Sequence, residues 1–262
     1  KNMQNKPKKS LGQNFLVDKN ILEKIIKIGD INIDDHILEI GPGTGNLTKL
    51  LVKSNVKKIT VIEKDNELSD NLKINLKDKV QVINADILKI PEKFYKEKYK
   101  VFGNLPYNIS TQILSKWCLN EKFKFNKLIL MFQKEVGERI IANVNTKNYS
   151  RLTILSNWKF NVNKICEINP GSFFPKPKVK SMLLEFTPKN SYIKIKNPKN
   201  LEKLTNFFFS ERRKMVKKKF KKLFKNYKNF IKKIGINETC RPQNISIEKY
   251  LLIVKELEKK SN

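Results

Sequence analysis

Four residues in the middle of the chain, Asn104-Leu105-Pro106-Tyr107, combine an amide, a proline and an aromatic ring without any charged group. The residue before a proline is pushed toward extended geometry, and the proline has no N–H to donate to a strand ladder. The stretch therefore predicts a stiff, exposed turn at the end of a strand, from which Asn104 and Tyr107 project. Taken alone, it fits a capped turn with a half-buried tyrosine equally well, so its neighbours must decide.

Other residue types that commonly carry chemistry are scarce. The only histidine, His36, precedes the first strand pattern, and the three cysteines (Cys118, Cys166 and Cys240) form no C-x-x-C pair. We therefore expect reduced, buried or incidental thiols, no Ser-His-Asp triad and no metal site. No apolar run approaches the roughly 18 residues of a membrane span, and the first ten residues lack the apolar stretch of a secretory signal. These features predict a cytoplasmic protein, with an organellar matrix as the alternative.

A second set of residues suits a nucleoside cofactor. The stretch "LEIGPGTGNLT", residues 38–48, places a glycine turn between a strand and a helix, where the backbone must approach a ligand too closely for any Cβ. Glu63 ends the second strand, where a carboxylate can hold both hydroxyls of a ribose, and Asp86 follows the third, where it can accept from an adenine amine. Dinucleotide and S-adenosylmethionine sites share such a turn, and each acid alone could be a helix cap or a surface charge. Three such features in register favour a nucleoside site.

The elements that must position these residues form an α/β pattern. From residue 36, short apolar runs alternate with amphipathic stretches, which predicts a parallel sheet covered by helices. Two later runs are separated by a Pro-rich loop rather than a helix, which predicts an antiparallel hairpin that closes the sheet. The strand candidates are HILEI (36–40), KITVIE (58–63), VQVIN (80–84), YKVFGN (99–104), KLILMF (127–132), VNKICEI (162–168) and KSMLLEF (180–186).

The carboxy-terminal part differs in composition and charge. Residues 199–260 predict short amphipathic helices, along which phenylalanines are spaced at Phe207, Phe208, Phe220 and Phe224. Between Arg212 and Lys233, twelve of 22 residues are Lys or Arg and none is acidic. Such a run can be a solvated helix face, yet a run of one sign interleaved with aromatic rings is better suited to tracking phosphates.

The whole chain carries the same bias. Its 262 residues include 55 Lys and Arg against 25 Asp and Glu, a net charge of +30. An AT-rich genome can account for part of the lysines but not for the excess over acids, so nucleic acid is the leading candidate partner. We predict two domains: residues 1–189, with a basic amino-terminal segment 1–19 that carries QNFL, and a helical, RNA-binding domain of residues 190–262.

Nine stretches spread over nearly the whole length form one series: SLGQNFLVD, EIGPGTGNLT, NADIL, NLPYNIS, MFQKEVGERI, YSRLTIL, SFFPKPKVKS, FFFSERRKMVKKKF and RPQNIS. In this series the chain resembles the ribosomal RNA small-subunit adenine dimethyltransferases of the KsgA type. The resemblance implies a Rossmann-like methyltransferase sheet with a small helical carboxy-terminal domain, and S-adenosyl-L-methionine as cofactor. The residues that it implies for cofactor binding are Asn14, Leu16, Gly41, Gly43, Glu63, Asp86 and Asn104.

The opening stretch then has a chemical role. The exocyclic amine of adenine is a poor nucleophile because its lone pair is delocalised into the ring, so the enzyme needs hydrogen-bond acceptors more than a base. The side-chain oxygen of Asn104 and the main-chain carbonyl of Leu105 can accept from this amine and hold it in line with the methyl group. Tyr107 supplies an aromatic wall for the base. By resemblance Phe173 supplies the opposite wall, while Phe174 is expected in the core.

RNA contacts are expected on two basic segments. Family likeness makes "QKEVGER" an RNA-facing edge that includes Arg139, although a simple surface helix start explains the same residues. Arg212, Arg213 and Lys214 carry a stronger expectation because they open the predicted basic helix.

The resulting hypothesis is an enzyme that dimethylates two adjacent adenosines in a hairpin loop near the 3′ end of small-subunit rRNA, with a role in small-subunit biogenesis. Its expected partner is the immature small subunit, and we expect a monomer with no membrane association. A large-subunit rRNA adenine methyltransferase of the antibiotic-resistance type is the first alternative. A non-catalytic nucleic-acid-binding factor on the same fold is the second, although the intact glycine turn and NLPY argue against it.

Overall fold

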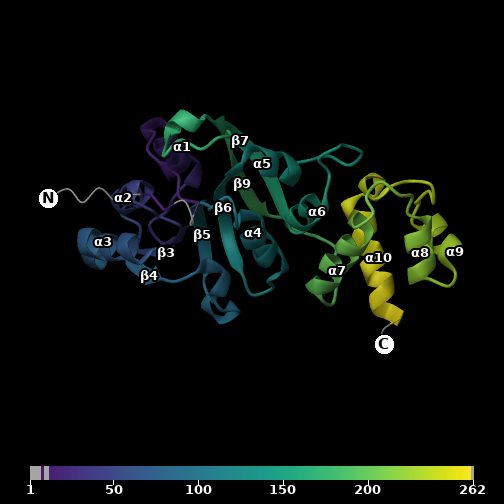
Figure 1. Ribbon diagram of the computed structural model, residues 1–262. Coiled ribbons are helices and arrows are strands. Elements are labelled where there is room, and N and C mark those ends of the chain that lie inside the picture. The colour runs from purple at the N-terminus through teal and green to yellow at the C-terminus, as the bar shows by residue number, and fades with distance from the viewer. Residues whose placement is uncertain (1–6, 9–11, 261–262) are drawn as a thin grey trace. The chain divides into compact units, whose positions relative to one another are not determined.

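The computed structural model describes residues 7–8 and 12–260, and their contacts divide them into two compact units (Figure 1). The first unit comprises residues up to 117 together with 122–137 and 161–188. The second comprises 118–121, 138–160 and 189 onward. A single division after residue 189 does not express this grouping, because residues 138–160 cluster with the carboxy-terminal helices. The predicted division into domains of residues 1–189 and 190–262 stays a prediction.

The first unit is built on a seven-stranded sheet of order β4-β3-β2-β5-β6-β9-β7, which confirms the predicted α/β class. Strands β2 to β6 pair in parallel, whereas β9 runs antiparallel to β6. All seven strand candidates are present, and the two later runs occupy one edge as expected. The strands are β2 (His36–Ile40), β3 (Lys58–Glu63), β4 (Gln81–Asn84), β5 (Lys98–Asn104), β6 (Lys124–Gln133), β7 (Phe160–Ile168) and β9 (Ser181–Pro188).

A separate two-stranded sheet joins distant parts of the chain. Strand β1 (Phe15–Leu16) pairs antiparallel with β8 (Phe173–Phe174), which lies in the Pro-rich loop between β7 and β9. The Val17 N–H donates to the Ser172 carbonyl at 2.9 Å, and the Ser172 hydroxyl donates to Asp18 at 2.8 Å. These bonds fix the amino-terminal segment against the loop.

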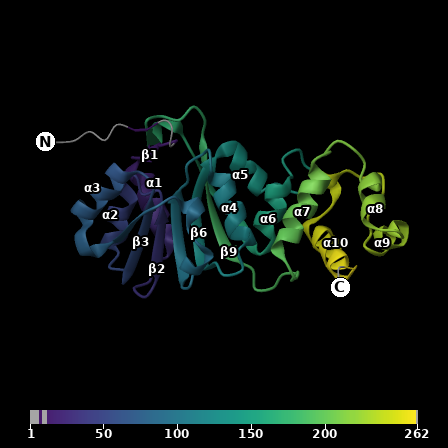
Figure 2. The same cartoon turned by 60° about the horizontal axis from the view of Figure 1, so that its bottom comes forward.

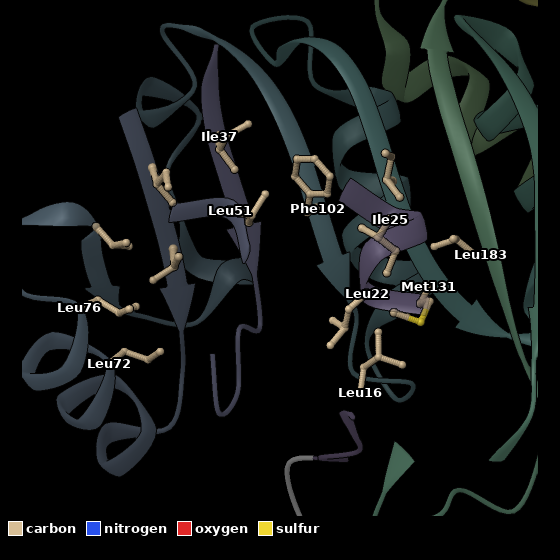
Figure 3. Close-up of a cluster of buried hydrophobic side chains, with 14 of the residues drawn as sticks. Leu16, Leu22, Ile25, Ile37, Leu51, Leu72, Leu76, Phe102, Met131 and Leu183 are labelled. Carbon is tan, nitrogen blue, oxygen red and sulfur yellow. The ribbon is translucent and has the colours of Figure 1, made fainter. Parts of the chain in front are cut away.

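Helices cover both faces of the sheet. One face packs against α1 (Lys19–Gly29), α2 (Asn46–Lys53) and α3 (Asn66–Leu76) in a continuous apolar cluster (Figure 3). Phe102 and Met131 contribute to this cluster, while the alternate residues Val101 and Leu130 are equally buried outside it. Near-continuous apolar runs predict strands that are buried on both faces. Each large apolar side chain buried in this way contributes about 1.5–3 kcal/mol to stability. The first unit also holds α4 (Ser110–Leu119) up to residue 117 and most of α5 (Lys134–Ile140).

The second unit is helical, as the carboxy-terminal composition predicted (Figure 2). Its core contains Phe208, Phe220 and Tyr250, all fully buried and in edge-to-face contact around Phe208. Its helices are α6 (Arg151–Trp158), α7 (Pro198–Phe209), α8 (Lys217–Leu223), α9 (Tyr227–Lys233) and α10 (Ile247–Lys260). Short 3₁₀ turns complete the described elements at Lys77–Lys79, Ile87–Lys89, Glu92–Phe94, Pro170–Ser172 and Pro242–Asn244.

Candidate functional site

The carboxyl ends of the parallel strands bring the predicted site residues together. The chain leaves β2 toward β3 on one side and returns to pair β5 on the other, so the strand order reverses beside β2. Open α/β sheets bind ligands at such a reversal. Gly41, just after β2, donates its N–H to the Ile62 carbonyl at 3.0 Å, and an added Cβ would lie 3.5 Å from the Asn104 carbonyl. Gly41, the end of β3 and the end of β5 therefore line one opening.

The glycine turn requires residues without a side chain. Gly41 and Gly43 have φ of 65° and 57°, in the left-handed region that other residues rarely adopt. A Cβ on Gly43 would lie 2.6 Å from the Phe15 ring, which packs directly on the turn. The sequence predicted that a ligand lies close to this turn. At Gly43, the group that lies close to the backbone is the ring of Phe15, in the QNFL segment.

Glu63 is a buried carboxylate held by backbone donors. One oxygen accepts from the Gly43 N–H at 3.1 Å and the other from the Asp65 N–H at 2.9 Å. Burial raises the pKa of Glu63 above its ordinary value, although these hydrogen bonds oppose the shift. Each oxygen keeps a further lone pair, so the carboxylate can still accept from a ligand hydroxyl.

Asp86 lies just after β4, as predicted, and its environment differs from that of Glu63. It accepts from the Leu88 N–H at 3.0 Å and pairs with Lys64 at 2.9 Å. Burial opposes its ionisation, but Lys64 and the Leu88 N–H outweigh that cost and hold the pKa of Asp86 below its ordinary value. Asp86 is therefore an ionised acceptor at the edge of the opening.

Asn104 is oriented by the amino-terminal segment. Its Nδ2 donates to the Asn14 carbonyl oxygen at 2.6 Å. A carbonyl oxygen only accepts, so the amide must turn its nitrogen toward Asn14 and its Oδ1 away from it. The segment is tied in turn to the sheet, because Gln13 donates to Asp65 at 3.1 Å. Asn104 thus presents a fixed acceptor.

The rest of the NLPY turn is partly buried. Leu105 is 1% exposed, so this residue contributes its main chain rather than its side chain to the opening. Tyr107 is half-buried, and its hydroxyl is hydrogen-bonded to the Ser181 hydroxyl. Burial raises the pKa of Tyr107, which keeps the phenol neutral. The hydrogen bond fixes the ring from its far end.

One cavity of about 140 Å³ in the first unit is lined by nine of the predicted site residues. They come from the QNFL segment, the glycine turn, the ends of β3 and β4, and NLPY. These residues are Asn14, Leu16, Gly41, Gly43, Glu63, Asp86, Asn104, Leu105 and Tyr107.

The two phenylalanines of β8 are placed opposite to the prediction. Phe173 is 2% exposed and belongs to the apolar cluster beneath the sheet, and it does not line the cavity. Phe174, expected in the core, is 62% exposed and pairs across the small sheet with the cavity residue Phe15. Neighbouring strand residues point to opposite faces, so only one of the two can be buried, and here it is Phe173.

The predicted RNA-binding residues are not grouped on one helix. Arg212, Arg213 and Lys214 lie in a turn between α7 and α8, so they do not open the basic helix, which begins at Lys217. Arg212 donates to the Lys147 carbonyl and thereby holds a neighbouring loop. Lys214 pairs with Glu211 at 2.6 Å, whereas Arg213 is exposed.

Three of the four phenylalanines that the sequence singled out here are also not available to bases. Phe208 and Phe220 are fully buried and Phe224 is 3% exposed, because their spacing forms the core of the second unit. Arg139 lies in α5, half-exposed, and its carbonyl accepts from Thr153 at 2.6 Å. The basic side chains alone remain candidates for phosphate contact.

Glu39 lines the cavity and was not singled out from the sequence. It is 2% exposed, and burial raises its pKa to about 8, with the Thr48 hydroxyl donating to it at 2.7 Å. It is therefore protonated at neutral pH. A charged residue inside the apolar run HILEI was the available signal.

The three cysteines, all within residues 12–260, are free thiols. In the part of the chain that the structure describes, no group of three or more His, Cys, Asp or Glu side chains is arranged to hold a metal ion. No helix within residues 7–8 and 12–260 has the length and apolarity needed to cross a membrane.

Comparison with known proteins decides the family. The model of the family "Ribosomal RNA adenine dimethylase" matches residues 4–259. The chain belongs to this family. It is accordingly a methyltransferase of rRNA adenine, as the resemblance implied.

Individual relatives agree over nearly the whole chain. "Ribosomal RNA small subunit methyltransferase A" of Pelagibacter ubique (strain HTCC1062) is 54% identical over 256 residues, covering 97% of both chains. A dimethyladenosine transferase from Plasmodium falciparum has a TM-score of 0.79 at 32% identity, covering 94% of this chain and 98% of that one. The 23S rRNA methyltransferase ErmE (TM-score 0.70, 23% identity, 94% and 100% coverage) shares the fold.

Proposed function

We propose that this protein transfers methyl groups from S-adenosyl-L-methionine to the exocyclic amines of two adjacent adenosines in a hairpin loop near the 3′ end of small-subunit rRNA. The substrate is the immature small subunit, and the protein acts on it as a monomer. Support for the small subunit comes from the relatives of the chain, whose names specify that subunit. Support for adenine comes from the family.

The cavity fits the proposed cofactor. A left-handed glycine turn that a Cβ would obstruct, a buried carboxylate and an ionised acid on adjacent strands suit a nucleoside with a charged tail. Glu63 would hold the ribose hydroxyls, Asp86 the adenine amine, and the turn around Gly41 and Gly43 the tail. When bound, the cofactor supplies an electrophilic methyl group on a sulfonium.

The single observation that carries the proposal is the orientation of Asn104. Because Nδ2 is committed to Asn14 at 2.6 Å, Oδ1 is left to accept from a target amine beside the glycine turn. The Leu105 carbonyl, followed by a proline, supplies a second main-chain acceptor in the same cavity wall. Two acceptors on one amine draw it toward tetrahedral geometry and expose its lone pair. The proton released on methylation leaves through these acceptors to solvent, so no histidine is required.

Tyr107 forms one wall for the adenine, with its hydroxyl fixed by Ser181. We assign the second aromatic contact to Phe174 rather than Phe173, because only Phe174 exposes its ring, on a small sheet whose partner Phe15 lines the cavity. Each ring would restore part of the stacking that the adenine loses on leaving the RNA, on the order of 1–3 kcal/mol.

Basic side chains would capture the RNA through its phosphates. Of the residues expected to do so, Arg213 and Lys214 are exposed in the turn before α8, and Arg139 is half-exposed on α5. Arg212 contributes by holding the loop around Lys147.

The substrate assignment is tested with labelled cofactor. Purified small subunits lacking adenine dimethylation and, separately, large subunits are incubated with the protein, and the labelled rRNA is digested and mapped by mass spectrometry. The proposal expects N6-dimethyl label on two adjacent adenosines of the small subunit alone. Label confined to the large subunit would support the resistance-type alternative, and no label in either would support a non-catalytic factor.

A further inference from the structure

The second unit carries an open groove of about 360 Å³ that none of the assigned roles uses. It lies along one face of α7 and reaches the carboxyl ends of α8 and α10. All of its lining residues belong to this unit. They are Lys196, Asn200, Lys203, Leu204, Phe207, Leu223, Leu257 and Glu258.

The floor of the groove is apolar. Leu204 is 3% exposed, whereas Phe207, Leu223 and Leu257 are only half-buried. Side chains at successive turns of α7 place Leu204 and Phe207 side by side. A planar ligand ring can bury its apolar surface on this floor, where the aromatic side chain of Phe207 is one of its contacts.

The rim of the groove is basic. Lys196 and Lys203 are exposed at its edge. The Lys219 ammonium lies 4.4 Å from the centre of the Phe207 ring, and Lys260 lies 4.4 Å from that of Phe224. Lys219 is partly neutralised by Glu211, with which it pairs at 2.8 Å. Lys219 is buried, and neither it nor Lys260 lines the groove, so the positive charge at the rim itself comes from Lys196 and Lys203.

The one acid among the lining residues, Glu258, is already satisfied. It accepts from the Lys196 N–H at 2.7 Å, the Asn197 N–H at 3.0 Å and Asn200 Nδ2 at 2.9 Å. These donors are neutral, so Glu258 keeps its negative charge and offsets part of the positive charge of Lys196, while Lys203 adds a second positive charge at the mouth of the groove. Asn200 commits its nitrogen to Glu258, which leaves its carbonyl oxygen as an acceptor for a ligand N–H.

We propose that this groove binds one unpaired nucleotide of RNA, with the base on the apolar floor and the adjoining phosphates at Lys196 and Lys203. The charge around it favours RNA over a protein segment or a second copy of this chain, because the nearby run from Arg212 to Lys233 has twelve basic residues in 22 and no acid. The proposal rests on the proposed function only in taking RNA as the ligand. It assigns the second unit a base contact in addition to phosphate contacts.

The test compares two single-stranded oligoribonucleotides of about ten nucleotides. One carries all its bases, and the other carries abasic nucleotides at the central positions. Binding is measured by fluorescence anisotropy. The parent protein should prefer the complete strand by about tenfold, the order of one base–aromatic contact. Leu223→Asp should remove that preference, while binding of the abasic strand should weaken no more than in Met215→Asp, which adds the same negative charge outside the groove. Lys203→Glu should weaken binding of both strands.

Matched controls exist on the same unit. Met215→Asp changes an apolar side chain that is 56% exposed and outside the groove, and Lys199→Glu changes an exposed lysine of α7 that does not line it. Both should retain the parent preference. Far-ultraviolet circular dichroism checks that Leu223→Asp is folded, and Lys203→Glu tests the rim with an exposed residue.

Crosslinking locates the base directly. A strand with 5-iodouridine at the central position should crosslink to the peptide that contains Phe207. The proposal is overturned if the parent binds both strands equally, if Leu223→Asp keeps the preference, or if crosslinks map only to the first unit. Methyl transfer is assayed separately on small subunits. If the parent protein transferred no methyl group, the proposed function would fail, but the binding and crosslinking results for the groove would still stand.

Discussion

The cavity of the first unit and the basic helices of the second unit differ in how far their side chains are fixed by the backbone. In the first unit, seven of the nine candidate cavity residues lie at or just after the end of a parallel strand, and the carboxyl ends of such strands meet at one edge. Position in the chain therefore determined position in the cavity. In the second unit, the run from Arg212 to Lys233 crosses a turn and two short helices, so its side chains point in several directions.

This difference explains which of the predicted residues come together. Glu63, Asp86 and Asn104 line one cavity, and their roles there stay predictions. In contrast, the phenylalanines between the lysines became the core of the second unit, and Arg212 holds a loop. Periodicity identifies a helix, but it does not say which of its faces a ligand will meet.

The largest effect is expected from Asn104→Ala, because the proposed chemistry of the first-unit cavity depends most on this residue. The variant loses the acceptor whose contact with the amine strengthens in the transition state, so kcat should fall on the order of 10² to 10³. Turnover is measured at saturating cofactor, because Asn104 also borders the cofactor region. RNA affinity, measured by filter binding, should stay close to that of the parent. Near-parent turnover would leave NLPY as a capped turn only.

Removing either strand-end acid should weaken cofactor binding on the order of 10- to 100-fold, since hydrogen bonds to charged groups are worth about 1.5–3 kcal/mol. Isothermal titration calorimetry with Glu63→Gln and Asp86→Ala measures this loss. Glu67→Ala, with a side chain 52% exposed beside the same site, is the matched control and should bind normally. Parent affinity in both acid variants would contradict their assignment.

The β8 pair separates binding from stability. Phe174→Ala should lower kcat/KM on the order of tenfold by removing an exposed ring, with little change in stability. Phe173→Ala should lower the free energy of unfolding by about 3–5 kcal/mol, because it empties a buried site. Methylation kinetics and urea unfolding distinguish the two. The reverse pattern would restore the assignment made from the family resemblance.

This pair also shows where prediction from the sequence stops. The seven strands, the helical carboxy-terminal part and the acids at the strand ends could be predicted, because apolar periodicity and strand ends are local signals. Asn14 and Leu16 were predicted only from the family resemblance. The faces of Phe173 and Phe174 depend on pairing of β8 with β1, whose two residues are far away in the chain. A two-residue strand has no periodicity from which that pairing could be read.

The smallest effect is expected at the basic turn of the second unit and the first residues of α8, where Lys218 lies. Arg213→Glu with Lys218→Glu should weaken RNA binding several-fold and lower the slope of log affinity against log salt by about 1 for each phosphate that is no longer neutralised. Lys93→Glu with Lys96→Glu makes the same charge change near the opposite end of β5 from Asn104 and should leave the slope closer to the parent value. Equal slopes in the two double variants would show that the turn and the start of α8 are only a solvated surface.

The most direct measurement is a crystal structure of the protein with S-adenosylhomocysteine and adenosine. The account predicts the ribose hydroxyls of the cofactor product on Glu63. It also predicts the exocyclic amine of the adenosine within hydrogen-bond distance of both Asn104 Oδ1 and the Leu105 carbonyl oxygen. An adenosine whose amine contacts neither acceptor, or a cofactor product bound away from the glycine turn, would contradict it.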